Sequence, residues 1–123
     1  MSGLLGDAIE PLADPARHLV VATVDGVVIG TADMLIAQNL THCARPWAIV
    51  ENVIVSGRHR GTGVGQAVME HLIGTARAAG CYKIQLLSGD HRAQAHVFYR
   101  AIGFESVAAG FKLYLDDARG RRG

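Results

Sequence analysis

Paired cysteines, long apolar runs and a surplus of charge are all missing from this sequence. Its two cysteines, Cys43 and Cys81, lie far apart without the paired spacing of a disulfide framework or a zinc site. His91 and His96 have no third ligand at suitable spacing, so we expect no bound metal. No apolar stretch approaches the ~20 residues of a membrane helix, and no secretory pattern opens the chain. The sequence therefore predicts a soluble, cytoplasmic protein that does not associate with membranes.

The charges nearly balance, with 12 Lys and Arg residues against 11 Asp and Glu residues, a net charge of +1. A nucleic-acid-binding surface needs a basic patch or stripe, whereas the basic residues here are spread along the chain. Only Arg119, Arg121 and Arg122 gather, in a tail (residues 118–123) that we interpret as flexible. Residues 1–117 have the size and composition of one folded domain, and we expect no nucleic-acid partner.

The most informative stretch is residues 50–66. It begins with the β-branched residues Val50, Val53, Ile54 and Val55, which have the composition of a strand buried on both faces. Gly61, Gly63 and Gly65 follow at alternate positions, so the backbone is free to adopt positive φ and to approach a ligand closely. Apolar residues at three-and-four spacing then predict a helix up to a stop at Gly80. A glycine-rich turn before a helix N-terminus offers free N–H groups to a phosphate or pyrophosphate.

Two common nucleotide-binding patterns do not match this stretch. A Walker-type loop ends in Gly-Lys-Ser/Thr, whereas Gly65 is followed by Gln66 and Ala67. The dinucleotide fingerprint needs a third glycine three positions after Gly63, and Gln66 stands there. A glycine-rich turn that only joins a strand to a helix remains an alternative, because so short a pattern carries a false-positive risk.

The pattern Arg-x-x-Gly-x-Gly, filled by Arg60, Gly63 and Gly65, resembles the coenzyme A pyrophosphate loop of the GNAT superfamily of N-acetyltransferases. A second segment, Phe98-Tyr99-Arg100-Ala101-Ile102-Gly103-Phe104, resembles the Phe-Tyr-x-x-x-Gly-Phe segment that follows the second core strand in many GNAT enzymes. The two segments occur in the expected order, and the resemblance covers about residues 20–115.

Within that superfamily the chain is most similar in motif to glucosamine-phosphate N-acetyltransferases and their unassigned bacterial relatives. The segments that carry this similarity are Glu51-Asn52-Val53-Ile54-Val55 and Gly80-Cys81-Tyr82-Lys83-Ile84. There are departures from the pattern. Arg92 stands where the superfamily often has an Asn that meets the pantetheine arm, and Asn52 replaces an acid of the phosphosugar enzymes. The first strand and first helix that usually help to build the acceptor pocket are expected to be missing.

The other segments predict a mixed α/β sheet, antiparallel in its N-terminal half and parallel at its centre. Residues 18–24 and 27–36 are expected to form a hairpin around Asp25-Gly26. Residues 81–87 should form a strand parallel to the central one, because the chain enters it from a helix. We also expect a short helix over residues 4–13, a capping turn at 88–90, a helix over 92–101 and a last strand pair within 104–115.

The resemblance implies that acetyl-CoA is the acetyl donor and that a primary amine accepts the acetyl group. Glu51 is the best-placed general base, with substrate positioning as its alternative role. Tyr99 would protonate the leaving thiolate, or else be an aromatic core residue; we assign Phe98 to the core and Tyr99 to the cleft. Backbone N–H groups near Val53 to Val55 would hold the oxyanion if a bulge frees them. The predicted coenzyme-binding residues are Val53, Val55, Arg60, Gly61, Thr62, Gly63, Val64, Gly65 and Gln66.

The sequence thus predicts an N-acetyltransferase that acts on a small amine, such as an amino sugar or an amino acid derivative. A peptide or protein N-acetyltransferase and a non-catalytic CoA-binding regulatory module remain alternatives. We also expect a homodimer, because so short a chain leaves apolar sheet surface for a partner to cover.

Overall fold

The computed structural model describes residues 4–7, 15–87 and 93–116. These residues fall into two compact units, one within residues 1–87 and the other within residues 88–123, and each is described by itself. The predicted capping turn at 88–90 and the predicted basic tail at 118–123 lie outside the described residues.

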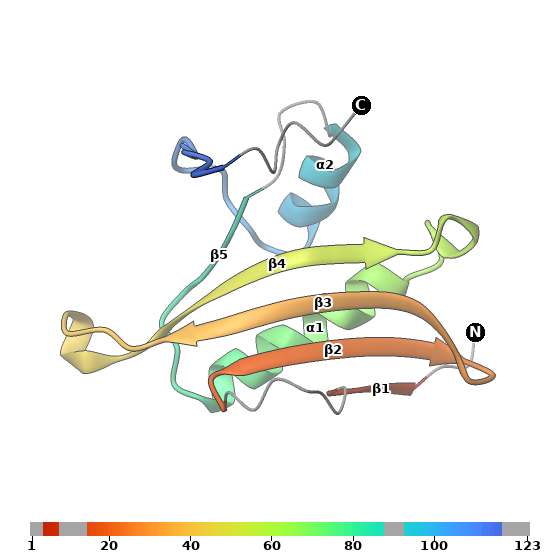
Figure 1. Cartoon of the computed structure of the whole chain (residues 1–123), viewed down its shortest axis with the longest axis horizontal. Helices are drawn as coiled ribbons and strands as arrows, with labels where there is room; N and C mark the ends of the chain where they lie inside the picture. Colours follow the sequence, from red (N-terminus) through yellow and green to blue (C-terminus); the bar gives the residue numbers. More distant parts are fainter. Residues whose placement is uncertain (1–3, 8–14, 88–92, 117–123) are drawn as a thin grey trace. The chain divides into compact units, whose positions relative to one another are not determined.

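A five-stranded sheet in the order β1-β2-β3-β4-β5 forms the first unit (Figure 1). The strands are β1 (Leu4–Asp7), β2 (Arg17–Val24), β3 (Val27–Ala37), β4 (Trp47–Val55) and β5 (Ile84–Leu86), with short 3₁₀ turns η1 (His42–Ala44) and η2 (Gly57–His59). The first four strands run antiparallel to their neighbours, whereas β5 is parallel to β4. The predicted mixed sheet is therefore confirmed, as is the hairpin around Asp25 and Gly26, which both have positive φ (51° and 80°).

Helix α1 (Val64–Ala78) packs on one face of this sheet and forms the core with it. Successive side chains of a strand point to opposite faces, so alternate positions of β2, β3 and β4 are buried. The buried strand residues include Val20, Ala22, Ala32, Met34, Ala48 and Val50, and those of α1 are Val64, Val68, Met69, Leu72 and Ala76. The three-and-four spacing predicts an apolar stripe made of Val64, Ala67, Val68, His71, Leu72, Thr75, Ala76 and Ala79. It is confirmed except that Ala79 is exposed, and Met69, outside the stripe, is also buried.

The predicted helix stop at Gly80 is also confirmed. Gly80 has a φ of 84°, and its N–H donates to the carbonyl of Arg77 at 3.0 Å. The N–H of Cys81 reaches back to the carbonyl of Ala76, also at 3.0 Å. These two bonds make a Schellman motif, which satisfies carbonyl groups at the helix end and turns the chain toward β5.

Two expectations for the first unit are wrong. Leu4–Asp7 is strand β1, paired with β2, and not the start of a helix, while residues 8–14 lie outside the described residues. Helical spacing over so few residues is a weak preference, and the open edge of β2 offers hydrogen-bond partners that override it. Strand β4 is not buried on both faces either: Val50 is 2% exposed, but Ile54, on the face away from α1, is 60% exposed.

The described part of the second unit contains one helix, α2 (Ala93–Ala101), and no strand. The expected helix is confirmed from Ala93 onward. The expected strand pair within residues 104–115 is wrong, since all of 104–116 is irregular. A strand forms only where a neighbour completes its hydrogen bonds, and the described residues of this unit supply none.

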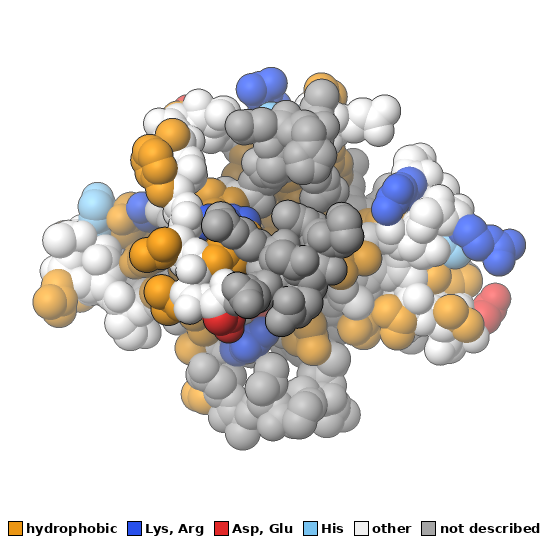
Figure 2. Space-filling model, turned by 45° about the horizontal axis from the view of Figure 1, so that its top comes forward, with side chains coloured by type: hydrophobic (Ala, Val, Ile, Leu, Met, Phe, Trp, Pro, Cys, Tyr) orange, Lys and Arg blue, Asp and Glu red, His pale blue; other side chains and the backbone are white. Residues whose placement is uncertain are grey.

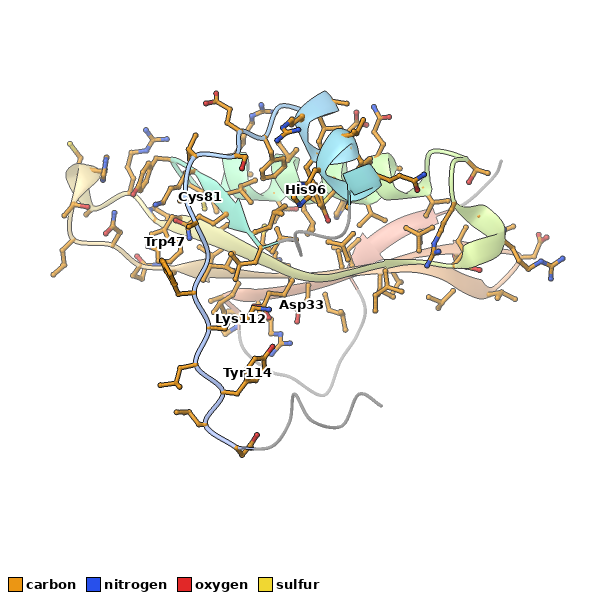
Figure 3. All side chains as sticks on the ribbon, turned by 90° about the horizontal axis from the view of Figure 1, so that it is seen from above. Asp33, Trp47, Cys81, His96, Lys112 and Tyr114 are labelled. Atoms are coloured by element: carbon orange, nitrogen blue, oxygen red, sulfur yellow. The ribbon has the colours of Figure 1, made fainter. Side chains whose placement is uncertain are left out.

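The face of the sheet opposite α1 carries an ion pair between β2 and β3. Asp33 is 8% exposed and points away from α1, as Figure 3 shows. The guanidinium of Arg17 binds it through two atoms: Nε donates to Oδ1 at 2.9 Å, and Nη2 donates to Oδ2. A bidentate pair satisfies both oxygens of a carboxylate that would otherwise be buried as an uncompensated charge.

Replacing Arg17 by Ala should therefore lower the free energy of unfolding by about 1–3 kcal/mol, because Asp33 then loses its partner. The midpoint of urea unfolding measures the loss. Arg77→Ala, which removes an exposed arginine from the last turn of α1, is the control and should cost less than about 1 kcal/mol. Equal losses in the two variants would contradict a stabilising role for the ion pair.

Candidate functional site

Two of the three glycines predicted to shape the phosphate loop, Gly61 and Gly63, have the expected conformation between β4 and α1. Gly61 and Gly63 have positive φ, 78° and 92°, which is the left-handed region that other residues adopt only with strain. Gly65 instead lies inside α1. A Cβ at Gly61 or Gly63 would meet no heavy atom within 4 Å, so the space beside this backbone is open.

No side chain of the described residues caps the N-terminus of α1 with a hydrogen bond. Gly63 is the N-cap and provides no side chain, and the first turn has no acidic residue. The first intrahelical bond runs from the N–H of Ala67 to the carbonyl of Gly63, so the preceding N–H groups of the helix remain available. Arg58 and Arg60 are exposed in the same loop, and Figure 2 shows separate basic side chains on the right of the view. This combination attracts an anion.

His59 leaves one polar atom of the loop unsatisfied. Its Nδ1 is buried and has no hydrogen-bond partner among the described residues. The carbonyl of His59 accepts from both the hydroxyl and the N–H of Thr62, so Thr62 closes the loop on itself. An unsatisfied buried nitrogen costs about 1–3 kcal/mol, which favours a ligand that brings a partner to it.

A β-bulge interrupts the pairing of β3 with β4 just before this loop. Thr31 pairs with Ile54 and Asp33 pairs with Glu51, so two residues of β4, at positions 52 and 53, lie opposite the single residue 32 of β3. The bulge that the predicted oxyanion site requires is therefore present next to Val53. A bulge leaves one residue unpaired and bends the strand.

The second half of β4 has only one neighbouring strand among the described residues. The last parallel pair is Val50 with Leu86, and β4 continues to Val55 without β5. The N–H of Ser56 donates to the carbonyl of Ile29 on β3 at 2.8 Å. Because successive N–H groups of a strand point to opposite sides, the N–H of Val55 points away from β3. It is therefore directed to the side where β4 has lost its partner.

Glu51 lies on β4 immediately before the bulge, on the sheet face opposite α1. It is exposed and pairs across the strands with Asp33. Two carboxylates directly opposite each other repel, but Arg17 already pairs with Asp33. Glu51 is thus the exposed carboxylate of this pair and is accessible to a substrate cation.

Tyr99 lies on the last turns of α2, where a Schellman motif ends the helix. The N–H of Phe104 donates to the carbonyl of Tyr99 at 3.0 Å, and that of Gly103, with a φ of 109°, donates to the carbonyl of Arg100 at 3.0 Å. The ring of Tyr99 meets that of Phe104 edge-on, with centroids 5.9 Å apart. Phe98 also contacts Tyr99 edge-on at 5.1 Å, so the two adjacent rings are closer than helical geometry led us to expect.

The predicted coenzyme-binding residues all lie in the first unit, between the second half of β4 and the first turn of α1. Gln66 is exposed there, and its Nε2 donates to Glu70 on the same helix at 3.1 Å. Sequence reasoning missed His59, Asp33 and Gly30. A glycine inside an apolar strand often marks a close backbone approach, so the position of Gly30 was a usable signal.

Among the described residues, no group of three or more His, Cys, Asp or Glu side chains could hold a metal ion. No helix of that same part of the chain is long and apolar enough to cross a bilayer.

Comparison with known proteins identifies the fold and the family. A family model described as "Acetyltransferase (GNAT) family" matches residues 4–104. A solved structure, "Putative acetyltransferase from Agrobacterium tumefaciens str. C58", superposes with a TM-score of 0.80 at 43% identity, over 83% of this chain and 71% of that one.

Two curated relatives carry named activities. Glucosamine 6-phosphate N-acetyltransferase of Trypanosoma brucei brucei is 31% identical over 73% of this chain and 59% of its own length. Aminoglycoside N(6')-acetyltransferase type 1 of Stenotrophomonas maltophilia is 29% identical over 85% of this chain and 75% of its own length. The match thus spans somewhat more than half of the trypanosomal protein. With the fold and the family model in agreement, the chain belongs to the GNAT family of acetyltransferases, an enzyme family whose members in general use acetyl-CoA.

Proposed function

We propose that this protein binds acetyl-CoA and transfers its acetyl group to a primary amine of a small molecule. The observation that carries the proposal is the loop from β4 to α1, in which Gly61 and Gly63 expose backbone beside an uncompensated helix N-terminus. A coenzyme A pyrophosphate is a dianion, and the loop offers it N–H donors, the positive end of a helix dipole and two exposed arginines. A Cβ on either glycine would meet no heavy atom within 4 Å, so the backbone there is open to a ligand.

The proposed reaction joins the amine nitrogen to the thioester carbonyl carbon and breaks the carbon–sulfur bond. An alkylammonium has a pKa of about 10, so the acceptor must lose a proton before it attacks. Glu51 takes that proton directly or through a water molecule, since its carboxylate is exposed at the bulge of β4. The carbonyl oxygen becomes an oxyanion during the attack, and backbone N–H groups of residues 53–55 that point away from β3, such as that of Val55, hold it.

Collapse of the tetrahedral intermediate expels the coenzyme thiolate, which must gain a proton. A thiol has a pKa of about 8.5 and a tyrosine about 10, so a neutral tyrosine can donate to the nascent thiolate at neutral pH. Tyr99 takes this role by its place in the Phe-Tyr-x-x-x-Gly-Phe segment, and the capped end of α2 fixes its backbone.

The acceptor class that fits best is an amino sugar. The two curated relatives described above are named for glucosamine 6-phosphate and for aminoglycosides, both of which present an amine on a sugar ring. An exposed carboxylate such as Glu51 suits an acceptor that arrives as an ammonium ion.

Exchange of the loop glycine tests the coenzyme site. Gly63→Val should weaken acetyl-CoA binding at least about tenfold, because a β-branched residue at a φ of 92° distorts the donors at the helix start. Gly80→Val is the matched control, since Gly80 has a φ of 84° and equally open surroundings at the opposite end of α1. Calorimetric titration should give wild-type affinity for the control. Equal affinities in the two variants would contradict the assignment.

Removing one hydroxyl tests the proton donor. Tyr99→Phe keeps both ring contacts but should lower kcat about 100-fold or more, while the acetyl-CoA affinity changes less than about threefold. Release of free thiol with an amino sugar acceptor measures the rate. Tyr114→Phe removes a partly exposed hydroxyl outside the segment and should leave turnover unchanged. Wild-type turnover in Tyr99→Phe would remove the role.

The protein is also proposed to be a homodimer. Phe111, Leu113 and Leu115 are 91%, 85% and 92% exposed, and three large apolar side chains in so short a segment favour a protein partner. Sedimentation at micromolar concentration should give a dimer, and Leu113→Glu with Leu115→Glu should shift it toward the monomer. A monomeric wild-type protein would contradict the proposal.

A further inference from the structure

We propose that Gly30 of β3 is a positioning residue for the coenzyme loop, because its missing side chain sets where α1 begins. The inference rests on the proposed binding of acetyl-CoA by the loop. Gly30 is buried and does not have positive φ. A glycine is therefore needed at this position for the space that it leaves free, and not for an unusual backbone conformation.

Val64, the first residue of α1, fills that space. A Cβ on Gly30 would lie 2.8 Å from Cγ1 of Val64, a distance at which something must move. Val64 is 1% exposed, and a valine in a helix strongly prefers one rotamer, so its side chain has no free direction in which to turn away. A side chain at position 30 therefore displaces the helix start or the strand itself.

The loop is attached to β3 at both of its ends. At the start, the N–H of Ser56 donates to the carbonyl of Ile29 at 2.8 Å. At the end, Val64 rests on Gly30, the next residue of the same strand. Two adjacent residues of β3 thus fix the span between the last residue of β4 and the first turn of α1.

This attachment determines how the N–H donors of the loop converge. If the helix start moves while Ser56 stays bonded to Ile29, the loop cannot follow as a rigid body and its donors change direction. A hydrogen bond weakens steeply when its donor–hydrogen–acceptor angle falls. A shift of roughly a few tenths of an ångström at Val64 therefore weakens the hydrogen bonds that the loop donates to a bound pyrophosphate. A preorganised loop loses affinity when that organisation is lost.

The test is a double-mutant cycle read by calorimetric titration of acetyl-CoA. Gly30→Ala should weaken binding about tenfold or more, because the new methyl group forces Val64 away. Val64→Ala removes the Cγ1 atom in conflict and keeps the backbone donors. The affinity of the Gly30→Ala/Val64→Ala double variant for acetyl-CoA should therefore be within about threefold of that of Val64→Ala alone, although two core positions are changed.

Two controls separate positioning from loss of stability. Val20→Ala removes a side chain of 0% exposure from β2 and should lower the melting temperature without changing the affinity. Gly74→Ala makes the same chemical change in α1 with nothing within 4 Å and should leave the affinity unchanged. If Gly30→Ala does not fold, the double variant still tests the inference, because it should fold and bind.

The outcomes distinguish the two proposals. Wild-type protein that does not bind acetyl-CoA would overturn the proposed function and this inference with it. Binding by the wild type with unchanged affinity in Gly30→Ala would overturn the positioning role alone. A double variant that folds but binds as weakly as Gly30→Ala would also overturn it, because the contact with Val64 would then not be the cause.

Discussion

The contact between Val64 and Gly30, a residue of β3 without a side chain, decides where α1 begins. The proposed coenzyme site depends on that placement. The free N–H groups at the start of α1 can donate to the coenzyme only if they lie next to the end of β4. Figure 1 shows α1 starting at the end of the sheet where β4 finishes. The burial of Val64 and of the stripe behind it holds the helix in place, and the glycines of the loop then need only to leave the backbone accessible.

Strand β4 has two halves with different physical roles. The first half lies between β3 and β5, with Ala48 and Val50 buried, and belongs to the core. The second half follows the bulge and, within the described part of the chain, pairs with β3 alone, so its backbone groups on the other side are not used by a described strand. Where a strand loses its neighbour, its unpaired backbone N–H and C=O groups can form directional hydrogen bonds with a ligand, and no polar side chain is needed.

Local signals explain what the sequence could predict. The Asp25-Gly26 turn, the apolar stripe of α1 and the glycine stops after both helices are each decided within a few residues. The rest depends on contacts between distant segments. Strand β1 forms because β2 offers an open edge, the bulge arises from register between β3 and β4, and Asp33 is buried because Arg17 pairs with it. None of these leaves a local pattern, although Gly30 within an apolar strand was a visible sign of close packing.

We propose that the coenzyme pyrophosphate lies against the loop that β3 holds in place. Amide chemical-shift mapping of the whole protein during addition of acetyl-CoA tests it most directly, because every backbone N–H reports separately. The largest changes are expected at Val55 and at residues 61–66, where the N–H of Thr62 is bonded to the carbonyl of His59 but the first N–H groups of α1 are available to a ligand. Saturable binding with its largest changes elsewhere, and with these amides unmoved, would contradict it.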